Sequence, residues 1–416
     1  MSDEPAIFVS HSSADGETAR RLRVGLAAAL ETRGLRMLLD ETHLGPGDLW
    51  KPILHRWLAE CDGAIVLLAP VALTKPWVRK EATILAWRAA LRPDLGVVPV
   101  LIDGVTPEQV EEAFPAVELE ASQVVRVPAN PTDEALAAVV AEIVERLPVG
   151  LSGDDDVRRW VRDVADQLGD VRPHAFAALV DQLDVADEPW RAPPERCRVV
   201  AHELHHVPTL DDVEGYVTPI VRDMRDRRYF VESVAPVGIP VDAAAPLIRA
   251  FARDPGRRVL ALNGHEFETA VRYVERATCG NRYFESRQVA GPVPEDAVEH
   301  VCAAARGWLL ASTGAGTERR IARQLAAIDR RGRRVLVLPL HNEECPDGLT
   351  RAVVRDVVAR LCEELPHLVL LVLTGPDYAG VDDLWPDAVR VAPGPTDVDT
   401  ELDENAVYRR LLEQAG

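Results

Sequence analysis

Two kinds of hydrophobic pattern alternate along the first third of the chain. Short continuous apolar runs are typical of parallel strands buried on both faces, and apolar residues spaced three or four apart are typical of amphipathic helices. The runs predict strands at 6–10, 35–40, 63–68, 96–102 and 122–127, and the spacing predicts helices at 17–32, 48–61, 78–92 and 133–147. Strands that alternate with helices predict one doubly wound α/β domain with a parallel sheet.

The rest of the chain divides into a helical part and a second α/β part. Residues 148–156 are rich in turn formers and acids, and a helical pattern follows over 157–185 and, with breaks at Pro208 and Pro219, over 195–228. From Tyr229 the strand–helix rhythm returns, which predicts strands at 258–262, 283–289, 308–312, 334–339 and 368–374 and helices at 317–331, 349–365 and 404–414. We therefore expect an α/β domain over 1–147, a linker and helical connector over 148–228, and a Rossmann-like α/β domain over 229–416.

The net charge of the 416 residues is −20, which argues against a general nucleic-acid binder and against docking on an anionic membrane. The six cysteines include no CxxC pair, so the usual zinc knuckles are excluded. The sequence shows neither an N-terminal apolar signal segment nor an apolar run of membrane-spanning length. We expect a protein of the reducing cytoplasm.

Polar side chains follow three strands of the first predicted domain, at the edge where open α/β sheets bind ligands. Trp77 and Glu81 stand four residues apart at the start of a predicted helix, so they share one helix face. A carboxylate beside an aromatic plane can hold a ribose and stack a flat ring. Spacing alone, however, favours a core tryptophan and a solvated acid near the helix N-terminus. The other strand-end candidates are Ser10, His11, Ser12, Asp40, His43 and Trp50.

Four sequence boxes resemble, in order and spacing, those of TIR domains. They are Phe8-Val-Ser-His-Ser12, Leu39-Asp40 before a glycine-rich loop, Ile65-Val-Leu-Leu-Ala-Pro70 and Trp77-Val-Arg-Lys-Glu81. The resemblance covers the first third of the chain and implies a flavodoxin-like fold. In TIR enzymes the glutamate that matches Glu81 is required for cleaving the nicotinamide–ribose bond of NAD+. The resemblance therefore implies an NAD+ nucleosidase with Glu81 as its catalytic carboxylate.

The chemistry implied by this resemblance needs no metal or other cofactor, and NAD+ is the substrate. Nicotinamide leaves as a neutral group and generates an oxocarbenium-like centre, which a carboxylate at the ribose hydroxyls stabilises. Capture by water gives ADP-ribose and capture by the adenine ring gives a cyclic product, and the sequence leaves both open. Ser12-Ser13 replaces the basic pair of the animal enzyme, which leaves the phosphate contacts open. The residues implied to border the nucleotide are Phe8, Ser10, His11, Ser12, Asp40, His43, Trp50 and Trp77.

The resemblance also implies an assembly. TIR active sites are typically completed by a neighbouring protomer, so we expect self-association into an oligomer or filament on activation. The bacterial TIR NADases that the boxes resemble suggest a role in antiphage defence by NAD+ depletion. The alternative is a non-catalytic TIR adaptor that signals through self-association alone.

His202-Glu-Leu-His-His206 matches the HExxH pattern, which places two imidazoles on one helix face for zinc and supplies a glutamate as general base. Pro208 would end such a helix almost at once. The next acids along the chain are too close for the usual third ligand; they are Asp211, Asp212 and Glu214. We therefore expect no metal site, although the sequence leaves open whether His202 or His206 ever binds a metal.

The C-terminal α/β part contains a glycine-rich turn, Ser312-Thr-Gly-Ala-Gly-Thr317, between a predicted strand and a predicted helix. Backbone amides at such a turn can bind an anion, and the same residues also fit a tight turn with Thr317 as helix cap. Asn263-Gly264 and Thr374-Gly375 end two further predicted strands. These ends predict a site for a small-molecule activator, with a protein activator as the alternative. The candidate residues are Asn263, Gly264, Ser312, Gly314, Gly316 and Thr317.

Overall fold

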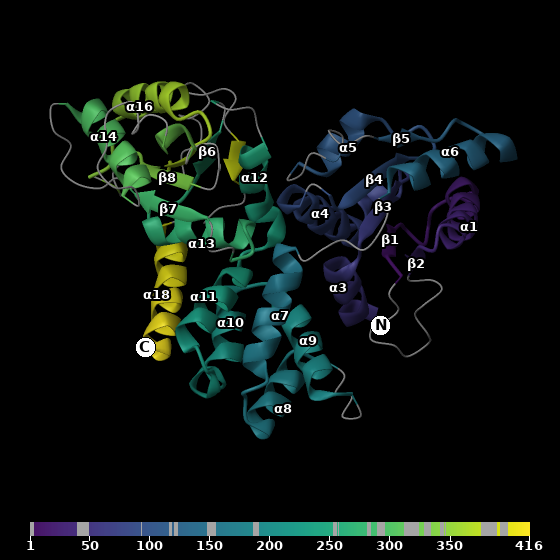
Figure 1. The fold of residues 1–416 in the computed structure, drawn as a ribbon, viewed down its shortest axis with the longest axis horizontal. Helices are drawn as coiled ribbons and strands as arrows, with labels where there is room; N and C mark the ends of the chain where they lie inside the picture. Colours follow the sequence, from purple (N-terminus) through teal and green to yellow (C-terminus); the bar gives the residue numbers. More distant parts are fainter. Residues whose placement is uncertain are drawn as a thin grey trace. The chain divides into compact units, whose positions relative to one another are not determined.

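The computed structural model divides the chain into two compact units (Figure 1). The N-terminal unit comprises Met1–Pro208 and Gly215–Val237, and the C-terminal unit comprises Thr209–Glu214 and Gly238–Gly416. The structure describes residues 4–39, 50–92, 94–115, 119, 124–147, 155–185, 191–252, 256, 258–280, 284–288, 296–311, 324–327, 334–341, 345, 347–375, 389–391 and 398–416. The predicted Asp40 and His43, and the turn at 312–317, lie outside these residues.

A five-stranded parallel sheet forms the centre of the N-terminal unit. Its strands stand in the order β2-β1-β3-β4-β5. They are β1 (Ala6–Ser10), β2 (Arg36–Leu38), β3 (Gly63–Leu68), β4 (Gly96–Leu101) and β5 (Val125–Arg126). Every residue of β1 and β3 is buried, as expected for central strands covered on both faces. The prediction of an α/β fold with a parallel sheet is confirmed.

Helices cover both faces of this sheet. Alternate residues of β1 point to opposite faces, so Ile7 and Val9 join a core with α1 (Glu17–Thr32) and α6 (Asp133–Arg146). Phe8 faces the other way, and its ring centroid lies 6.4 Å from that of Trp57. Trp57 belongs to α3 (Trp50–Glu60), which contacts α4 (Pro76–Leu91), and the short α5 (Pro107–Ala113) follows β4.

The helical part of the N-terminal unit begins with α7 (Asp156–Leu168) and α8 (Pro173–Gln182). The helical pattern predicted over 157–185 forms two helices, because the residue before a proline disfavours the helical conformation and Arg172 has a ψ of 140°. α9 (Pro193–Leu204) packs along α7 and contacts α3. α10 (Leu210–Val217), whose residues up to Glu214 belong to the C-terminal unit, and α11 (Arg227–Val234) follow, with breaks near the two predicted prolines.

A second parallel sheet, in the order β10-β6-β9-β8-β7, forms the centre of the C-terminal unit. The strands predicted at 258–262, 283–289, 334–339 and 368–374 are confirmed, and the short β10 is an addition. The strands are β6 (Val259–Leu262), β7 (Glu285–Gln288), β8 (Arg334–Pro339), β9 (Val369–Leu373) and β10 (Val389–Val391). The helices are α12 (Val241–Ala252), α13 (Phe267–Ala277), α14 (Ala297–Leu310), α16 (Arg351–Glu364) and α18 (Val398–Ala415).

The strand predicted at 308–312 is wrong, because residues up to Leu310 belong to α14. The run Trp308-Leu-Leu is short, and a short apolar run does not distinguish a buried strand from a helix. Val301, Ala305 and Leu309 are buried at intervals of four residues, which is the helical repeat. The final helix is also longer than the predicted 404–414, since α18 begins at Val398.

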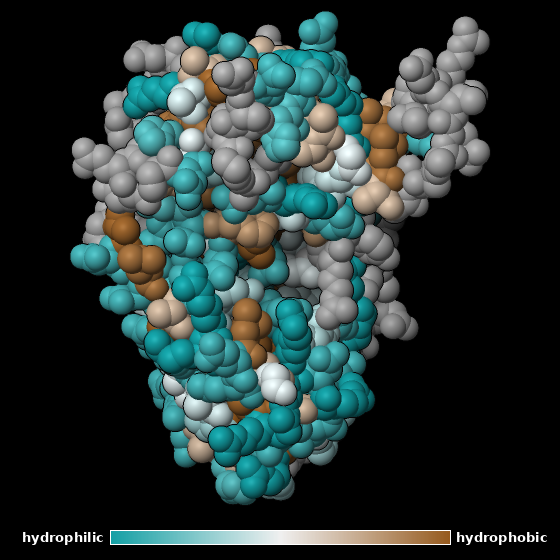
Figure 2. Space-filling view, turned by 90° about the vertical axis from the view of Figure 1, so that its left-hand side faces the viewer, coloured by the Kyte–Doolittle hydropathy of each residue, from teal (hydrophilic) through white to brown (hydrophobic). Residues whose placement is uncertain are grey.

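The described part of the chain exposes few large apolar side chains. Figure 2 shows one face of the molecule, on which hydrophilic residues predominate and apolar residues form small separate groups. Within the described ranges, the exposed large hydrophobic residues are Val24, Trp50 and Leu402. No single helix in the described part of the chain is both long and apolar enough to cross a membrane. One pair of helices, Arg227–Gly238 and Val241–Ile248, reaches the required length and hydropathy only when the two are taken together, and the pair is sharply bent.

Candidate functional site

Glu81 and Ser10 meet at the carboxyl end of the first sheet. Ser10 is the last residue of β1, and its Oγ donates a hydrogen bond of 2.5 Å to Oε2 of Glu81. Glu81 lies in the second turn of α4, which begins at Pro76, and its exposed fraction is only 4%. Burying a carboxylate costs free energy unless the group accepts hydrogen bonds. The hydrogen bond from Ser10 offsets part of this cost for Glu81. Glu81 is therefore not the solvated acid that spacing alone favoured.

Two tryptophans, Trp50 and Trp77, form an aromatic wall, and Trp77 lies on the same helix as Glu81. Trp77 precedes Glu81 by one helical turn, and its ring meets that of Trp50 edge-on at 4.9 Å between centroids. Trp50 is 48% exposed. The indole Nε1 of Trp77 is buried and, among the residues that the structure describes, has no hydrogen-bond partner. A buried donor without a partner costs about 1–3 kcal/mol, so the wall contains a polar atom that an acceptor on a ligand would satisfy.

His55, which the sequence analysis missed, connects this wall to the helical part. Its Nε2 lies 3.2 Å from the Lys80 ammonium, and its Nδ1 lies 3.0 Å from Oε1 of Glu203. The Lys80 ammonium in turn stands 5.1 Å from the centroid of Trp77, in a cation–π contact. Burial lowers the pKa of His55 below its ordinary value, against the opposing effect of Glu203. No pattern around position 55 signals this role, since every partner is distant or on another helix.

The loop after β1 is ordered by a local turn. The Ser12 amide donates a hydrogen bond of 2.9 Å to Asp15 Oδ2, and the Ala14 amide donates one of 3.2 Å to Ser12 Oγ. Ser12 and His11 are both buried. Burial raises the pKa of Asp15, although the hydrogen bond from Ser12 opposes the shift. Asp15 is a second residue that the sequence analysis missed, and the Ser-x-x-Asp spacing was its available signal.

The HExxH segment does not form the zinc helix that the pattern describes. α9 ends at Leu204, and His202 Nε2 lies 3.2 Å from Oε1 of Glu60. Glu203 contacts His55, and His206 stacks on His55 with 3.9 Å between ring centroids. Among the residues that the structure describes, no group of three or more His, Cys, Asp or Glu side chains is placed to hold a metal ion. These side chains instead join the helical part to α3.

The carboxyl end of β6 in the C-terminal unit already holds a carboxylate from the same chain. Asn263 and Gly264 follow β6, and Thr374-Gly375 lies beside them, since the Gly375 amide donates to the Gly264 carbonyl at 3.3 Å. Glu401 of α18 accepts hydrogen bonds of 2.9 Å from the amides of His265 and Glu266 at the start of α13. An anion position of the kind predicted for this strand end is thus filled internally.

Further polar contacts secure this internal carboxylate. Thr269 Oγ1 donates to Glu401 at 2.6 Å, and Asn405 Nδ2 donates to Thr269 Oγ1 at 3.0 Å. A Cβ atom built on Gly264 would lie 3.0 Å from a Glu401 oxygen, so the glycine allows the close approach. Glu401 lies 137 positions after Gly264, and no local pattern indicates the pairing.

A pocket of about 380 Å³ opens between β7 and α14 in the C-terminal unit. Arg287 and Gln288 line it from β7, and His300 and Trp308 line it from α14. A Cβ atom built on Gly307 would meet nothing within 4 Å, which leaves open space beside the helix. Within the described residues neither Arg287 nor His300 forms an ion pair. In a chain of net charge −20, an arginine that forms no ion pair within the described residues, beside an imidazole that can donate a hydrogen bond, favours an anionic ligand.

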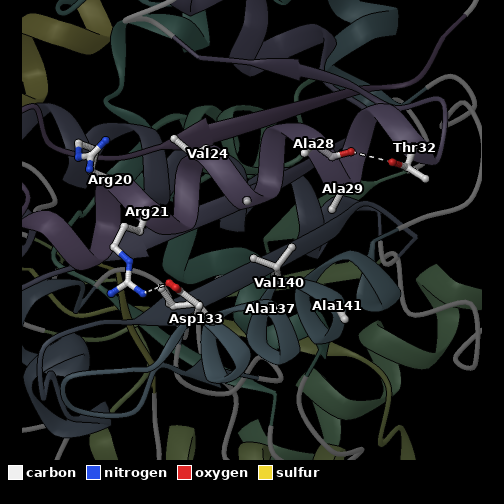
Figure 3. A pocket seen from close by; sticks show the side chains of 12 residues that line it. Arg20, Arg21, Val24, Ala28, Ala29, Thr32, Asp133, Ala137, Val140 and Ala141 are labelled. Atoms are coloured by element: carbon white, nitrogen blue, oxygen red, sulfur yellow. Dashed lines mark hydrogen bonds and ion pairs between the residues drawn. The ribbon is translucent and has the colours of Figure 1, made fainter.

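A shallow apolar groove of about 660 Å³ runs between α1 and α6 on the N-terminal unit (Figure 3). Small side chains line it, and Val24 at its rim is 63% exposed. The Arg21–Asp133 ion pair, at 2.5 Å, lies at one end of the groove. The small side chains are Gly25, Ala28, Ala29, Ala137, Val140 and Ala141.

Comparison with known proteins identifies the first of these regions. Residues 7–139 match the TIR domain family. The match runs from β1 into α6 and includes Ser10, Trp77 and Glu81, but it ends before the helical part and the second sheet. No curated protein matches the chain. The protein therefore contains an N-terminal TIR domain.

Proposed function

We propose that the TIR domain at residues 7–139 is an NAD+ glycohydrolase in which Glu81 is the catalytic carboxylate. The observation that supports this most directly is the 2.5 Å contact between Ser10 and Glu81. It shows a buried carboxylate that accepts from a hydroxyl at the ligand-binding edge of the sheet. A ribose hydroxyl of NAD+ is chemically equivalent to the Ser10 hydroxyl and takes its place when the substrate binds.

The proposed reaction breaks the bond between ribose C1′ and the pyridinium nitrogen. The bonding electron pair goes to that nitrogen, so nicotinamide leaves neutral and positive charge develops on the ribose. Glu81, hydrogen-bonded to the ribose hydroxyls, stabilises that charge in a site shielded from water. Water then adds its oxygen to C1′ and releases a proton, which gives ADP-ribose, whereas attack by an adenine nitrogen gives a cyclic product.

The proposed site is completed by a second copy of the chain. Trp50 supports this step, because a large aromatic ring that is 48% exposed stands directly beside Trp77. Covering it with a neighbouring protomer buries apolar surface and excludes water from the reacting centre. NAD+ depletion after assembly is the biological output we propose, in bacterial antiphage defence.

The decisive experiment compares Glu81→Gln with wild type. NAD+ loss is followed by chromatography over a range of protein concentrations, and Glu112→Gln on the exposed surface of α5 is the matched control. We expect turnover that rises with concentration in wild type and in the control, and a loss on the order of a hundredfold in the Glu81 variant. Unchanged turnover in Glu81→Gln would refute the proposal.

The second candidate is a TIR adaptor that assembles without catalysis. The exposed apolar groove between α1 and α6 favours it, because such a surface is suited to contact with another copy. Val24→Glu places a charge at the rim of this groove and should prevent assembly as measured by light scattering. Assembly by a wild-type protein that leaves NAD+ intact would select the adaptor function.

We further propose that the C-terminal unit binds an anionic activator in the pocket between β7 and α14. Arg287 supplies the positive charge, His300 supplies an imidazole that can donate a hydrogen bond, and Trp308 supplies an aromatic ring. Adenosine monophosphate is a suitable probe, with uncharged adenosine as its control. We expect the nucleotide, but not adenosine, to raise the melting temperature, and Arg287→Ala to abolish the effect. Equal responses to both probes would contradict an anion site.

A further inference from the structure

The helical part that follows the TIR domain packs against α3 and supplies a partner to a buried charge of α4. Figure 1 shows α7 and α9 next to α3 within the N-terminal unit, and contacts between these helices confirm it. Arg88 of α4 is only 1% exposed and forms an ion pair with Asp155, at the start of α7. The TIR family match ends at residue 139, so a charge buried inside the matched region is neutralised from outside it.

A chain of polar contacts leads from this helical part to the proposed substrate wall. Glu203 of α9 contacts His55 of α3, His55 contacts Lys80 of α4, and Lys80 lies over the ring of Trp77. Trp77 stands one turn before Glu81 on the same helix. We propose that Glu203 is a positioning residue, which acts through His55 and Lys80 to hold Trp77 where it binds the nicotinamide nucleotide. This inference rests on the proposed NAD+ cleavage.

With Lys80 as an ammonium and Glu203 as a carboxylate, one protonation state of His55 satisfies both contacts. A neutral His55 with its hydrogen on Nδ1 donates to Glu203 and accepts from the Lys80 ammonium at Nε2, whereas a doubly protonated ring could not accept from Lys80. Burial lowers the pKa of His55, which also favours the neutral ring. The carboxylate of Glu203 therefore selects the tautomer that holds Lys80 over Trp77.

The same pair of helices offers a matched control. Glu60 of α3 and His202 of α9 form a second carboxylate–imidazole contact, at 3.2 Å. Burial alone would raise the pKa of Glu60, but the hydrogen bond and charge of His202, together with Arg56, lower it to about 2. In the described part of the chain the Glu60 carboxylate reaches neither Lys80 nor Trp77. Loss of either pair weakens the same interface, but only the Glu203 pair leads to the substrate wall.

The test measures Trp77 directly and measures catalysis separately. The full chain is labelled with 5-fluorotryptophan, and the fluorine resonance of Trp77, one of eight tryptophans, is assigned with Trp77→Phe. Glu203→Ala should shift this resonance. Glu203→Gln keeps an acceptor for Nδ1–H of His55, so its resonance should lie close to that of wild type. Glu60→Ala should leave the resonance unchanged. In kinetics, Glu203→Ala should raise the KM for NAD+ by about tenfold with little change in kcat.

Each outcome separates this inference from the proposed function. An unchanged Trp77 resonance in Glu203→Ala overturns the positioning role, whatever the activity. An equal rise in KM for Glu60→Ala and Glu203→Ala also overturns it, because the effect would then belong to the interface in general. Absence of NAD+ cleavage by assembled wild type overturns the proposed function instead, and the resonance still decides whether Glu203 positions Trp77.

Discussion

Removing the charge of Asp155 should destabilise the N-terminal unit more than any surface substitution. The Arg88 guanidinium is buried, with Asp155 as its carboxylate partner and with further hydrogen bonds to the carbonyls of Leu58 at 2.5 Å and Cys61 at 3.3 Å. Asp155 also caps α7, since its Oδ1 accepts from the Arg158 amide at 2.8 Å. Asp155→Asn keeps a capping oxygen but leaves the guanidinium without a countercharge.

The expected loss follows from these two roles. Breaking a buried ion pair by removing one partner costs about 3–5 kcal/mol. Because the carbonyls of Leu58 and Cys61 still accept hydrogen bonds from Arg88, the expected loss for Asp155→Asn is at the lower end of this range, about 3 kcal/mol. Asp155→Ala also removes the cap, which adds about 1 kcal/mol. For a unit of this size each kcal/mol lowers the melting temperature by about 2–4 °C, so Asp155→Asn should lower it by about 6–12 °C.

Urea unfolding followed by tryptophan fluorescence measures the effect, and the pair Arg88→Met with Asp155→Leu is the control. Replacing both charges with apolar side chains removes the buried charge itself, so this double variant should recover most of the stability that Asp155→Asn loses. A loss below about 1 kcal/mol in Asp155→Asn would show that the Arg88 guanidinium does not depend on Asp155. Equal stability of the double variant and Asp155→Ala would likewise refute the reasoning.

Three further predictions concern other buried polar groups. Ser10→Ala leaves Glu81 without its hydroxyl donor, so the free energy of unfolding of the N-terminal unit should fall by about 1–3 kcal/mol in urea titrations, and an unchanged midpoint would contradict the contact. Burial lowers the pKa of His55, which faces Glu203, His206, Lys80 and Lys51. Because the unfolded chain then binds more protons than the folded one below pH 6.5, the free energy of unfolding should fall as the pH drops from 7.5 to 5.5. The fall should be less steep in His55→Asn. Parallel pH profiles for the two proteins would rule this out. Glu401→Ala should lower the melting temperature of the C-terminal unit and make it respond to added sulfate, which can occupy the vacated amides; insensitivity to sulfate would argue against that geometry.

All strands of the first sheet and four of the five in the second could be predicted because their signal is local, whereas the short β10 was missed. A run such as Val335–Leu338 is apolar at every position, which is typical of a strand buried on both faces. The wrong strand at 308–312 arose where the local signal is ambiguous, since three apolar residues fit a strand and the end of a helix equally. The break before Pro173 was locally encoded as well, but the amphipathic pattern across it concealed it.

The candidate site also has one part that the sequence could predict and one part that it could not. Trp77 and Glu81 share a helix face by spacing, and a resemblance in four boxes was enough to select them. The partners that give these residues their environment are far away in the sequence: Ser10 is separated from Glu81 by 71 positions, and His55 from Glu203 by 148. No periodicity links such positions, because each side chain is chosen for a contact that exists only after folding.

The HExxH segment shows the physical reason most clearly. By itself the sequence determined that His202, Glu203 and His206 lie close together, and on an isolated helix two of them would face a metal. The tertiary structure decided their partners by ending α9 at Leu204 and bringing Glu60 and His55 of α3 within reach. Backbone conformation depends on neighbouring residues, whereas the charge, burial and hydrogen bonding of a polar side chain depend on whichever distant segment excludes water from it.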